Sequence, residues 1–314
     1  MDVVTLGETM VLFTPVTTSP LRFSAQFEKS IGGAESNVAI ALARLGHSVR
    51  WISRLGADEF GLYTRNYIRG EGVDTSGVIF DEEHPTAVFF KERRTMQEPK
   101  VYYYRKGSAA SHMTPDDIRE DQIADASYLH ITGITPALSN TCRETVEHAI
   151  ALAKKNSVPI VFDPNIRLKL WSKEEARETL MGIAAQCDII LPGIEEGEIL
   201  TGAASPEEMS RIFIGQGARL VVVKLGAKGA YYRTEEEEAY VPGIEVPHIV
   251  DPIGAGDGFA AGVLSGLLQK RGIREAVMLG NRIGAYALTV AGDVEGYPYR
   301  EQIEPRSDHT DILR

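Results

Sequence analysis

The sequence is poor in cysteine: Cys142 and Cys187 are the two cysteines among 314 residues. They lie far apart and match no metal-binding or redox spacing. A fold that depends on disulfide bonds is therefore excluded. A chain of this length buries most of its apolar surface, so it can form a core without them. We expect both cysteines to be buried, reduced thiols.

Positive charge is also scarce, with 33 lysines and arginines against 44 aspartates and glutamates and a net charge of −11. A nucleic-acid-binding protein usually carries a basic excess or a basic stripe, so this balance argues against that class. An anionic small molecule remains compatible with it, because a few arginines can dominate one binding site whatever the total charge.

Long hydrophobic stretches are missing. The most apolar one, residues 258–268, is shorter than the roughly 20 residues that cross a bilayer, so no membrane partner is predicted. The N-terminus carries an acid at Asp2 and no basic segment before an apolar stretch, which does not fit a signal peptide. We expect a cytoplasmic protein.

What the sequence does contain is an alternation of strands and helices from about Ser127 onward. The runs Ile160-Val161-Phe162 and Val221-Val222-Val223 are apolar on both faces, as strands buried in a parallel sheet must be. The alternation predicts an α/β fold with a doubly wound, mainly parallel sheet and helices on both faces. The expected strands are 127–131, 159–163, 187–191 and 220–224, and the expected helices are 139–155 and 173–185.

Two other regions, 14–27 and 76–105, do not follow this alternation of strands and helices. Within the second, 87–92 and 100–105 are rich in β-formers and are separated by turn residues. Strands without intervening helices form an antiparallel patch, so we expect a small lid that closes over the carboxyl ends of the main strands. The lid and the sheet together would make one domain over residues 1–314.

The strongest local signal is the segment Asp251-Pro-Ile-Gly254-Ala255-Gly256-Asp257, followed by apolar residues at helical spacing. A glycine-rich turn that opens a helix presents free N–H groups to an anion, and glycine lets a phosphate approach them. An acid at Asp257 would repel a phosphate, but it could take the proton from an attacking hydroxyl. The alternative is a simple acid at a helix start.

A second signal is Gly32-Gly33-Ala34-Glu35-Ser36-Asn37, which leads into a helical stretch. Two glycines allow close approach of a ligand, and the Asn37 amide offers a donor and an acceptor to hydroxyls. Gly-Gly could also be a plain turn. The phosphate-binding motif G-x-x-x-x-G-K-[ST] is absent, and Phe259 stands where the dinucleotide motif needs glycine.

These two segments, in this order and separation, resemble the two motifs of the ribokinase-like (PfkB-type) carbohydrate kinases, and the resemblance extends from Val3 to about Asp293. It implies a ribokinase-like fold with a β-rich lid and transfer of phosphate from ATP with Mg²⁺. By the resemblance, Gly254, Ala255, Gly256 and Asp257 supply the anion hole and the base. Gly32, Gly33 and Asn37 would contact the sugar.

Further positions match the family one at a time. Lys224-Leu-Gly226-Ala-Lys228-Gly229 resembles the strand-end loop that packs against the nucleotide, and Asn281 would lie near the adenine. Asp163-Pro-Asn165-x-Arg167 resembles the D-x-N-x-R segment that faces both substrates. Glu196 keeps the acid of an N-x-x-E element that organises Mg²⁺ through water, but Gly193 replaces the asparagine.

Within the family, the chain looks most like 2-keto-3-deoxygluconate kinases, through Tyr102-Tyr103-Tyr104-Arg105, Arg167 and Asp293. A sugar acid carries a carboxylate whose desolvation needs a cation, and an arginine fork suits it. Arg105 and Arg167 could converge on that group, with Tyr103 as a further donor. Phe89 stands at a lid position where a related kinase can carry tyrosine.

We therefore predict an ATP-dependent kinase that acts on the terminal 6-hydroxyl of 2-keto-3-deoxygluconate. Fructokinase or another PfkB-type sugar kinase is the first alternative, and a non-catalytic nucleotide- or sugar-binding protein is a remote one. Exposed lid edges are usually covered, so we expect a homo-oligomer that pairs through the lids.

Overall fold

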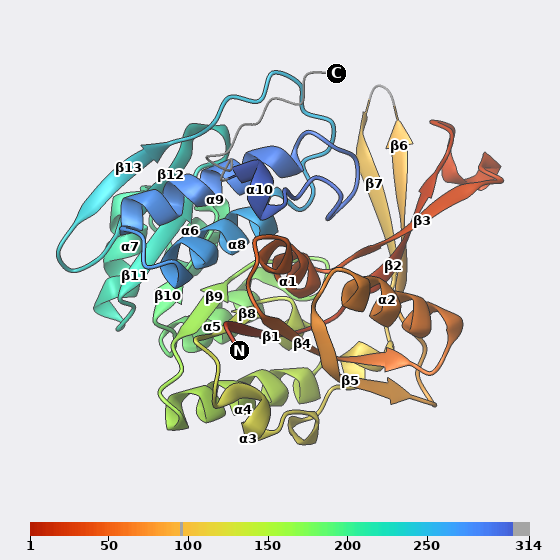
Figure 1. The fold of residues 1–314 in the computed structure, drawn as a ribbon, viewed down its shortest axis with the longest axis horizontal. Coiled ribbons are helices and arrows are strands. Elements are labelled where there is room, and N and C mark those ends of the chain that lie inside the picture. The colour runs from red at the N-terminus through yellow and green to blue at the C-terminus, as the bar shows by residue number, and fades with distance from the viewer. Residues whose placement is uncertain (95–96, 304–314) are drawn as a thin grey trace, which may run out of the picture.

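The computed structural model, which describes residues 1–94 and 97–303, contains a nine-stranded and a four-stranded sheet (Figure 1). The strand order in the larger sheet is β13-β12-β11-β10-β9-β8-β1-β4-β5. All its neighbours pair in parallel except β12 with β11 and with β13. Its strands are β1 Val3–Leu6, β4 Val49–Gly56, β5 Asp74–Asp81, β8 Tyr128–Thr132, β9 Ile160–Asp163, β10 Ile189–Ile190, β11 Leu220–Lys224, β12 Gly229–Arg233 and β13 Glu238–Pro242.

Helices cover both faces of this sheet. The helices are α1 Ala34–Arg44, α2 Glu59–Gly70, α3 Glu120–Ile123, α4 Asn140–Lys155, α5 Lys173–Ala184, α6 Ile194–Thr201, α7 Pro206–Gly215, α8 Ala255–Leu268, α9 Ile273–Ala287 and α10 Arg300–Ile303. One apolar core lies between the sheet and α1, α8 and α9, and the other lies between the sheet and α4, α5 and α7. Val222 belongs to the first core, whereas its neighbours Val221 and Val223 belong to the second, because successive strand residues face opposite ways. The predicted two-sided α/β fold is confirmed.

The predicted elements of the second half are confirmed to within a few residues. Helix α4 starts where its sequence requires, since the Ser139 hydroxyl accepts from the Cys142 N–H at 3.1 Å and caps the first turn. Cys142 and Cys187 are buried free thiols, as expected. Among the described residues, no helix has the length and apolar character that a membrane crossing requires.

The four-stranded sheet is the lid, and it projects from one side of the main body in Figure 1. Its order is β3-β2-β6-β7, with β2 Met10–Pro15, β3 Phe27–Gly32, β6 Val88–Arg94 and β7 Gln97–Tyr104. Its own buried cluster is small and consists of Met10, Leu12, Ala87 and Phe89.

Two expectations about the lid are wrong in detail. Residues 76–81 belong to β5, which pairs in parallel with β4 at the edge of the main sheet. The lid is also not purely antiparallel, because β2 and β6 run parallel, with Leu12 opposite Phe89. The run from β4 through α2 to β5 explains both differences: it is a further βαβ unit, and it separates the two lid hairpins in the sequence.

The topology determines where a ligand can bind. Strand β1 lies between β4 and β8, so the chain leaves β1 and later returns on its other side. Open α/β sheets bind ligands at such a switch point, beyond the carboxyl ends of the strands. The lid begins directly after β1, and it therefore stands over this edge of the sheet.

Candidate active site

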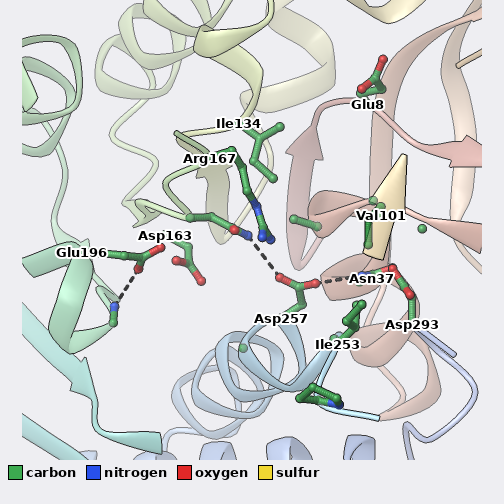
Figure 2. A pocket seen from close by; sticks show the side chains of 18 of the residues that line it. Glu8, Asn37, Val101, Ile134, Asp163, Arg167, Glu196, Ile253, Asp257 and Asp293 are labelled. Carbon is green, nitrogen blue, oxygen red and sulfur yellow. Dashed lines mark hydrogen bonds between the residues drawn. The ribbon is translucent and has the colours of Figure 1, made fainter. Parts of the chain in front are cut away.

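A cavity of about 540 Å³ lies at the carboxyl ends of the main strands and beneath the lid. It brings together segments far apart in the sequence (Figure 2). The predicted site residues that line it are Gly32, Gly33, Asn37, Phe89, Tyr103, Arg105, Asn165, Arg167, Glu196, Lys224, Gly226, Gly254, Gly256, Asp257 and Asp293.

The glycine-rich turn opens α8 as the sequence predicts. Gly254 is the N-cap in a left-handed conformation, with φ of 81°, which favours glycine. Its carbonyl accepts from the Gly258 N–H at 2.8 Å and from the Tyr297 hydroxyl at 2.7 Å. Because the first intrahelical bond starts at Gly258, the N–H groups of residues 255–257 have no partner within the helix. An anion can therefore be bound there.

The two glycines of this turn differ in what a side chain would meet. A Cβ at Gly254 would lie 2.2 Å from the Asp293 carbonyl oxygen, so packing and φ both require glycine there. A Cβ at Gly256 would meet no described atom closer than the Lys224 ammonium, at 3.9 Å. Gly256 faces the cavity, so its missing side chain leaves room for a ligand rather than for the protein.

Asp257 lies in the first turn of α8, and two amides hold its carboxylate. Asn37 donates to Oδ2 at 2.8 Å and Asn165 to Oδ1 at 3.4 Å (Figure 2). Burial raises the pKa of Asp257 to about 6, and the charge of Asp163 adds to this; the Asn37 hydrogen bond and the charges of Arg167 and Lys224 oppose it. A carboxylate with this pKa suits a general base at neutral pH.

Lys224 and Asp163 form a partly buried ion pair at the ends of β11 and β9. The ammonium lies 2.9 and 2.7 Å from the two carboxylate oxygens. Burial alone would lower the pKa of Lys224, but the charges of Asp163 and Glu196 outweigh it and the pKa is raised. The lysine therefore stays charged beside the glycine-rich start of α8.

Glu196 has a structural role that the sequence did not indicate. Its Oε2 accepts from the Gly193 N–H at 2.7 Å, which closes the first turn of α6, and its Oε1 accepts from the Ile166 N–H at 2.9 Å. Both contacts are to backbone, so the side chain of residue 193 is not needed for them. Among the described residues, no group of three or more acids, histidines or cysteines could hold a metal ion by itself. Mg²⁺ usually keeps several waters and is bound by one or two carboxylates together with substrate phosphates, so the carboxylates that line this cavity fit it.

The first glycine motif joins the lid to α1. A Cβ at Gly32 would lie 2.4 Å from Asp293 Oδ2, and one at Gly33 would lie 2.4 Å from the Glu8 carbonyl oxygen. Close packing therefore requires glycine at both positions, and both glycines also line the cavity. Burial raises the pKa of Asp293 to about 7, against the charge of Lys91, and its Oδ1 has no hydrogen-bond partner among the described residues.

On the lid side, aromatic and basic side chains meet. Phe89 stacks on Tyr103 with ring centroids 5.6 Å apart, and the Arg105 guanidinium lies 5.6 Å from the Tyr103 centroid. Arg105 forms an ion pair with Glu8 at 2.5 Å, and the Ser108 hydroxyl donates to the same carboxylate at 2.6 Å. Part of the charge of Arg105 is therefore balanced within the protein.

Arg167 differs from Arg105. Its side chain makes no hydrogen bond or ion pair with another described residue, and its guanidinium points into the cavity toward Asp257 (Figure 2). Its positive charge lowers the pKa of Asp257. Of the two arginines, Arg167 is the one whose planar fork stays available to a ligand.

Four predicted site residues lie outside the cavity lining, namely Ala255, Lys228, Gly229 and Asn281. The Asn281 amide donates to the Pro242 carbonyl at 3.0 Å, and a Cβ at Gly229 would lie 2.1 Å from the Val241 carbonyl oxygen. Both residues therefore pack against the end of β13 in this structure. Their contacts with a nucleotide stay predictions.

Sequence reasoning missed Glu8, Ile134, Val101 and Ile253, which also line the cavity. Glu8 could have been found, because an acid directly after the first strand of an α/β sheet lies at its carboxyl edge. The three apolar residues carry no such signal. Lys91 was missed too; its ammonium forms a buried ion pair with Asp251 and so joins the lid to the loop before α8.

Fold and site together define a doubly wound α/β protein with a glycine-rich helix start, a buried carboxylate in its first turn and a lid. Residues 1–300 match the family model described as pfkB family carbohydrate kinase. The chain belongs to the pfkB family of carbohydrate kinases, and the resemblance seen in its two motifs is confirmed.

Individual relatives cover almost the whole chain. A 2-dehydro-3-deoxygluconokinase of Bacillus subtilis is 40% identical over 305 residues, which are 96% of this chain and 94% of the relative. A putative ribokinase II of E. coli, solved in complex with ATP and Mg²⁺, is 27% identical with a TM-score of 0.90, over 96% of this chain and 97% of that one. A fructokinase of Vibrio cholerae, solved with fructose, ADP and calcium bound, is 32% identical with a TM-score of 0.84, over 95% and 96%.

Proposed function

We propose that this chain is an ATP-dependent sugar-acid kinase that phosphorylates the terminal 6-hydroxyl of 2-keto-3-deoxygluconate, which is the same compound as 2-dehydro-3-deoxygluconate. One observation carries the proposal: a single cavity holds both a buried carboxylate at an anion-binding helix start and two arginines, Arg105 and Arg167. Identity of 40% to a relative named 2-dehydro-3-deoxygluconokinase supports the substrate.

The residues divide into a nucleotide end and a substrate end. ATP supplies the phosphoryl group, and Mg²⁺ neutralises part of its charge when both are bound. Lys224, Gly226 and the free N–H groups of residues 255–257 would hold the phosphates, and Glu196 would hold Mg²⁺ through water. Asn165, beside Asp257, would contact the transferred phosphate.

Asp257 takes the proton from the sugar hydroxyl. Its two amide partners, Asn37 and Asn165, fix the carboxylate in one orientation, and burial keeps its pKa close enough to neutral for proton transfer. The N–H groups of the α8 turn stabilise charge on the phosphoryl group as it moves. The lid then excludes water from the closed cavity.

The substrate end recognises the sugar. Gly32, Gly33, Asn37 and Asp293 would contact its hydroxyls, and Phe89 with Tyr103 would cover it. Arg167 and Arg105 would bind the carboxylate with charge-assisted hydrogen bonds.

Fructokinase is the second candidate, and one contact favours it. Arg105 already pairs with Glu8 at 2.5 Å, so this arginine does not need a substrate carboxylate to be satisfied. The similarity to the Vibrio cholerae fructokinase points the same way. The two candidate functions differ in whether Arg105 leaves Glu8 to bind a carboxylate of the substrate.

A panel of sugars and sugar acids, with ATP and Mg²⁺ and detection of ADP, tests the proposal. We expect 2-keto-3-deoxygluconate to give the highest kcat/KM, with the phosphate on the 6-hydroxyl by NMR. A higher kcat/KM for fructose would replace the proposal with the fructokinase one. ATP binding without turnover of any panel member would favour a binding protein.

Two copies of the chain would pair through their lids. Strands β3 and β7 are both lid edges, and Tyr102 and Tyr104 on β7 are 40% and 65% exposed. Sedimentation of the wild type and of Tyr104→Lys tests this: we expect a dimer that the charged variant weakens. A wild-type monomer at micromolar concentration would contradict it.

A further inference from the structure

A second and wider cavity, of about 1250 Å³, opens next to the substrate end of the first. Strand β7 of the lid bounds it on one side, and residues 166–170 after β9 bound it on the other. The two cavities share Val101, Tyr103, Arg105 and Arg167, so one leads into the other. It does not include Lys224 or Gly226, which belong to the predicted nucleotide end.

The charges of the two cavities are opposite. The second is lined by five cationic residues and, among the described residues, by no acid; these cations, Lys100, Arg105, Lys106, Arg167 and Lys169, define what we call the basic groove. The first cavity is lined by six acids and three cations. The net charge of the chain is −11, so its composition does not predict a groove whose charged lining residues are all positive.

The charges of the basic groove are mostly uncompensated. Arg105 pairs with Glu8, but Lys100, Lys106, Arg167 and Lys169 make no ion pair with another described residue. Lys169 and Arg105 both lie 5.6 Å from the Tyr103 ring centroid, at the junction of the two cavities. Cations that lack protein partners and converge on one opening attract an anion there.

We propose that the basic groove is the entry route that captures the carboxylate of the sugar acid and steers it to Arg167 and Arg105. This inference rests on the proposed function, because it assumes an anionic sugar. A cleft lined by one sign of charge raises association rates about 10–10³-fold, and the gain falls steeply with ionic strength. The nucleotide does not use this route, since its end of the site lies elsewhere.

The experiment compares Lys106→Gln/Lys169→Gln with a control of equal charge change, Lys154→Gln/Lys155→Gln at the far end of α4. The kcat/KM for 2-keto-3-deoxygluconate is measured from about 0.01 M to about 0.15 M salt, over which the Debye length falls from about 30 Å to about 8 Å. Calorimetric Kd values for the same sugar acid, and KM for ATP, are measured alongside.

We expect the groove variant to lose about tenfold in kcat/KM at the lowest salt, consistent with the range for electrostatic steering. The loss should shrink to about twofold at the highest salt, because screening removes the effect of the missing charges. A structural defect would persist at all salt concentrations. The control variant and the KM for ATP should follow the wild type.

The outcomes separate this inference from the proposed function. If the sugar acid is the preferred substrate but the groove variant, the control and the wild type share one salt dependence, the groove does not steer it and the inference fails alone. A change confined to the KM for ATP would make the groove a nucleotide route and also overturn it. If fructose is the preferred substrate and the groove charges have no effect, both the inference and the proposed function fail.

Discussion

The two walls of the active-site cavity are held in place by different forces. The wall formed by the main sheet and α8 rests on two apolar cores, one on each face of the sheet. The lid has a cluster of four buried apolar residues. Polar contacts supplement this small core: Lys91 pairs with Asp251, and Arg105 pairs with Glu8.

This difference matches the work that each wall would do. The main wall carries Asp257 and the glycine-rich start of α8, whose geometry would have to be held closely for phosphoryl transfer. The lid carries Phe89, Tyr103 and Arg105, which would have to open and close around each substrate. Changes to the main wall should therefore abolish the reaction, whereas changes to the lid should alter which substrate is used.

The largest effect is expected from Asp257→Asn. The near-isosteric amide keeps the fold but removes the base, and loss of a general base typically costs ~10²–10⁴-fold in turnover. Steady-state kcat measures this, and calorimetric ATP binding should be retained or tightened because a negative charge near the phosphates is gone. Retention of more than about a tenth of wild-type turnover would show that another group takes the proton.

The next largest effect is expected at the glycine-rich start of α8, where substitutions of Gly256 and Gly254 form a matched pair. Gly256→Val fills space that the protein leaves open, so the fold should survive while kcat falls by about 10²–10³-fold, as for loss of an oxyanion donor. Gly254→Ala clashes with the Asp293 carbonyl and strains φ, so it should lower Tm as well. Thermal melts separate the two. Normal turnover of a folded Gly256→Val would exclude phosphate contact at this turn.

On the lid, Arg105 tests the substrate. A charge-assisted hydrogen bond contributes roughly 1.5–3 kcal/mol, so Arg105→Ala should lower kcat/KM for the sugar acid about 10–100-fold and hardly change that for fructose. Arg105→Lys should not rescue it, because an ammonium cannot replace the planar fork. Arg167 faces Asp257, so Arg167→Ala should harm every substrate and serves as the comparison. Equal losses for both sugars with Arg105→Ala would mean that Arg105 mainly holds Glu8.

The pH dependence of kcat/KM should report the ionisation of Asp257, which lies on the main wall. Burial raises the pKa of Asp257 to about 6, and the base is active when ionised, so kcat/KM should fall as pH drops through about 6, with about tenfold loss per unit below it. The Asp257→Asn variant should lose this limb. A limb unchanged in that variant would belong to another group.

The contribution of Asp257 to the free energy of unfolding should depend on pH in the opposite direction from kcat/KM. The folded-state pKa of Asp257 lies above its ordinary value of 3.8, so its stabilising contribution is present below about pH 4 and is lost as pH rises through about 6. Compared with the wild type, Asp257→Asn should therefore gain more in Tm at about pH 8 than at about pH 4. An equal difference at both pH values would mean that the carboxylate is not strained by burial.

The main wall could be predicted from the sequence in considerable detail. The apolar runs of β9 and β11 specify buried parallel strands, and the glycines before Asp257 specify a helix start, because these signals are local. The lid was harder. Whether residues 76–81 pair with the lid or with β4 depends on long-range pairing, and a β-rich stretch is compatible with both.

The same division holds within the site. Motif residues such as Asn37 and Asn165 were found because they lie beside glycines or strand ends, and the structure brings both to Asp257. The partner of Arg105 was not found, since Glu8 lies almost a hundred residues away in the sequence and only the folded lid brings them together. Ion pairs between distant segments leave no periodic or local pattern.

The smallest expected effect is on lid dynamics, and it tests the comparison of the two walls most directly. A thin β layer with a small core of its own should open locally at low cost, whereas strands between two helical layers should not. Hydrogen exchange in residues 88–94 of β6 and 100–104 of β7 should be faster than in β8 and β9 without ligand, and it should slow when the sugar acid is added. Lys91→Met, which removes the buried ammonium and leaves Asp251 without that partner, should speed lid exchange further and leave β8 and β9 unchanged. Lid exchange as slow as that of β8 in the unliganded protein would show that the polar contacts hold the lid as firmly as the apolar cores hold the main sheet.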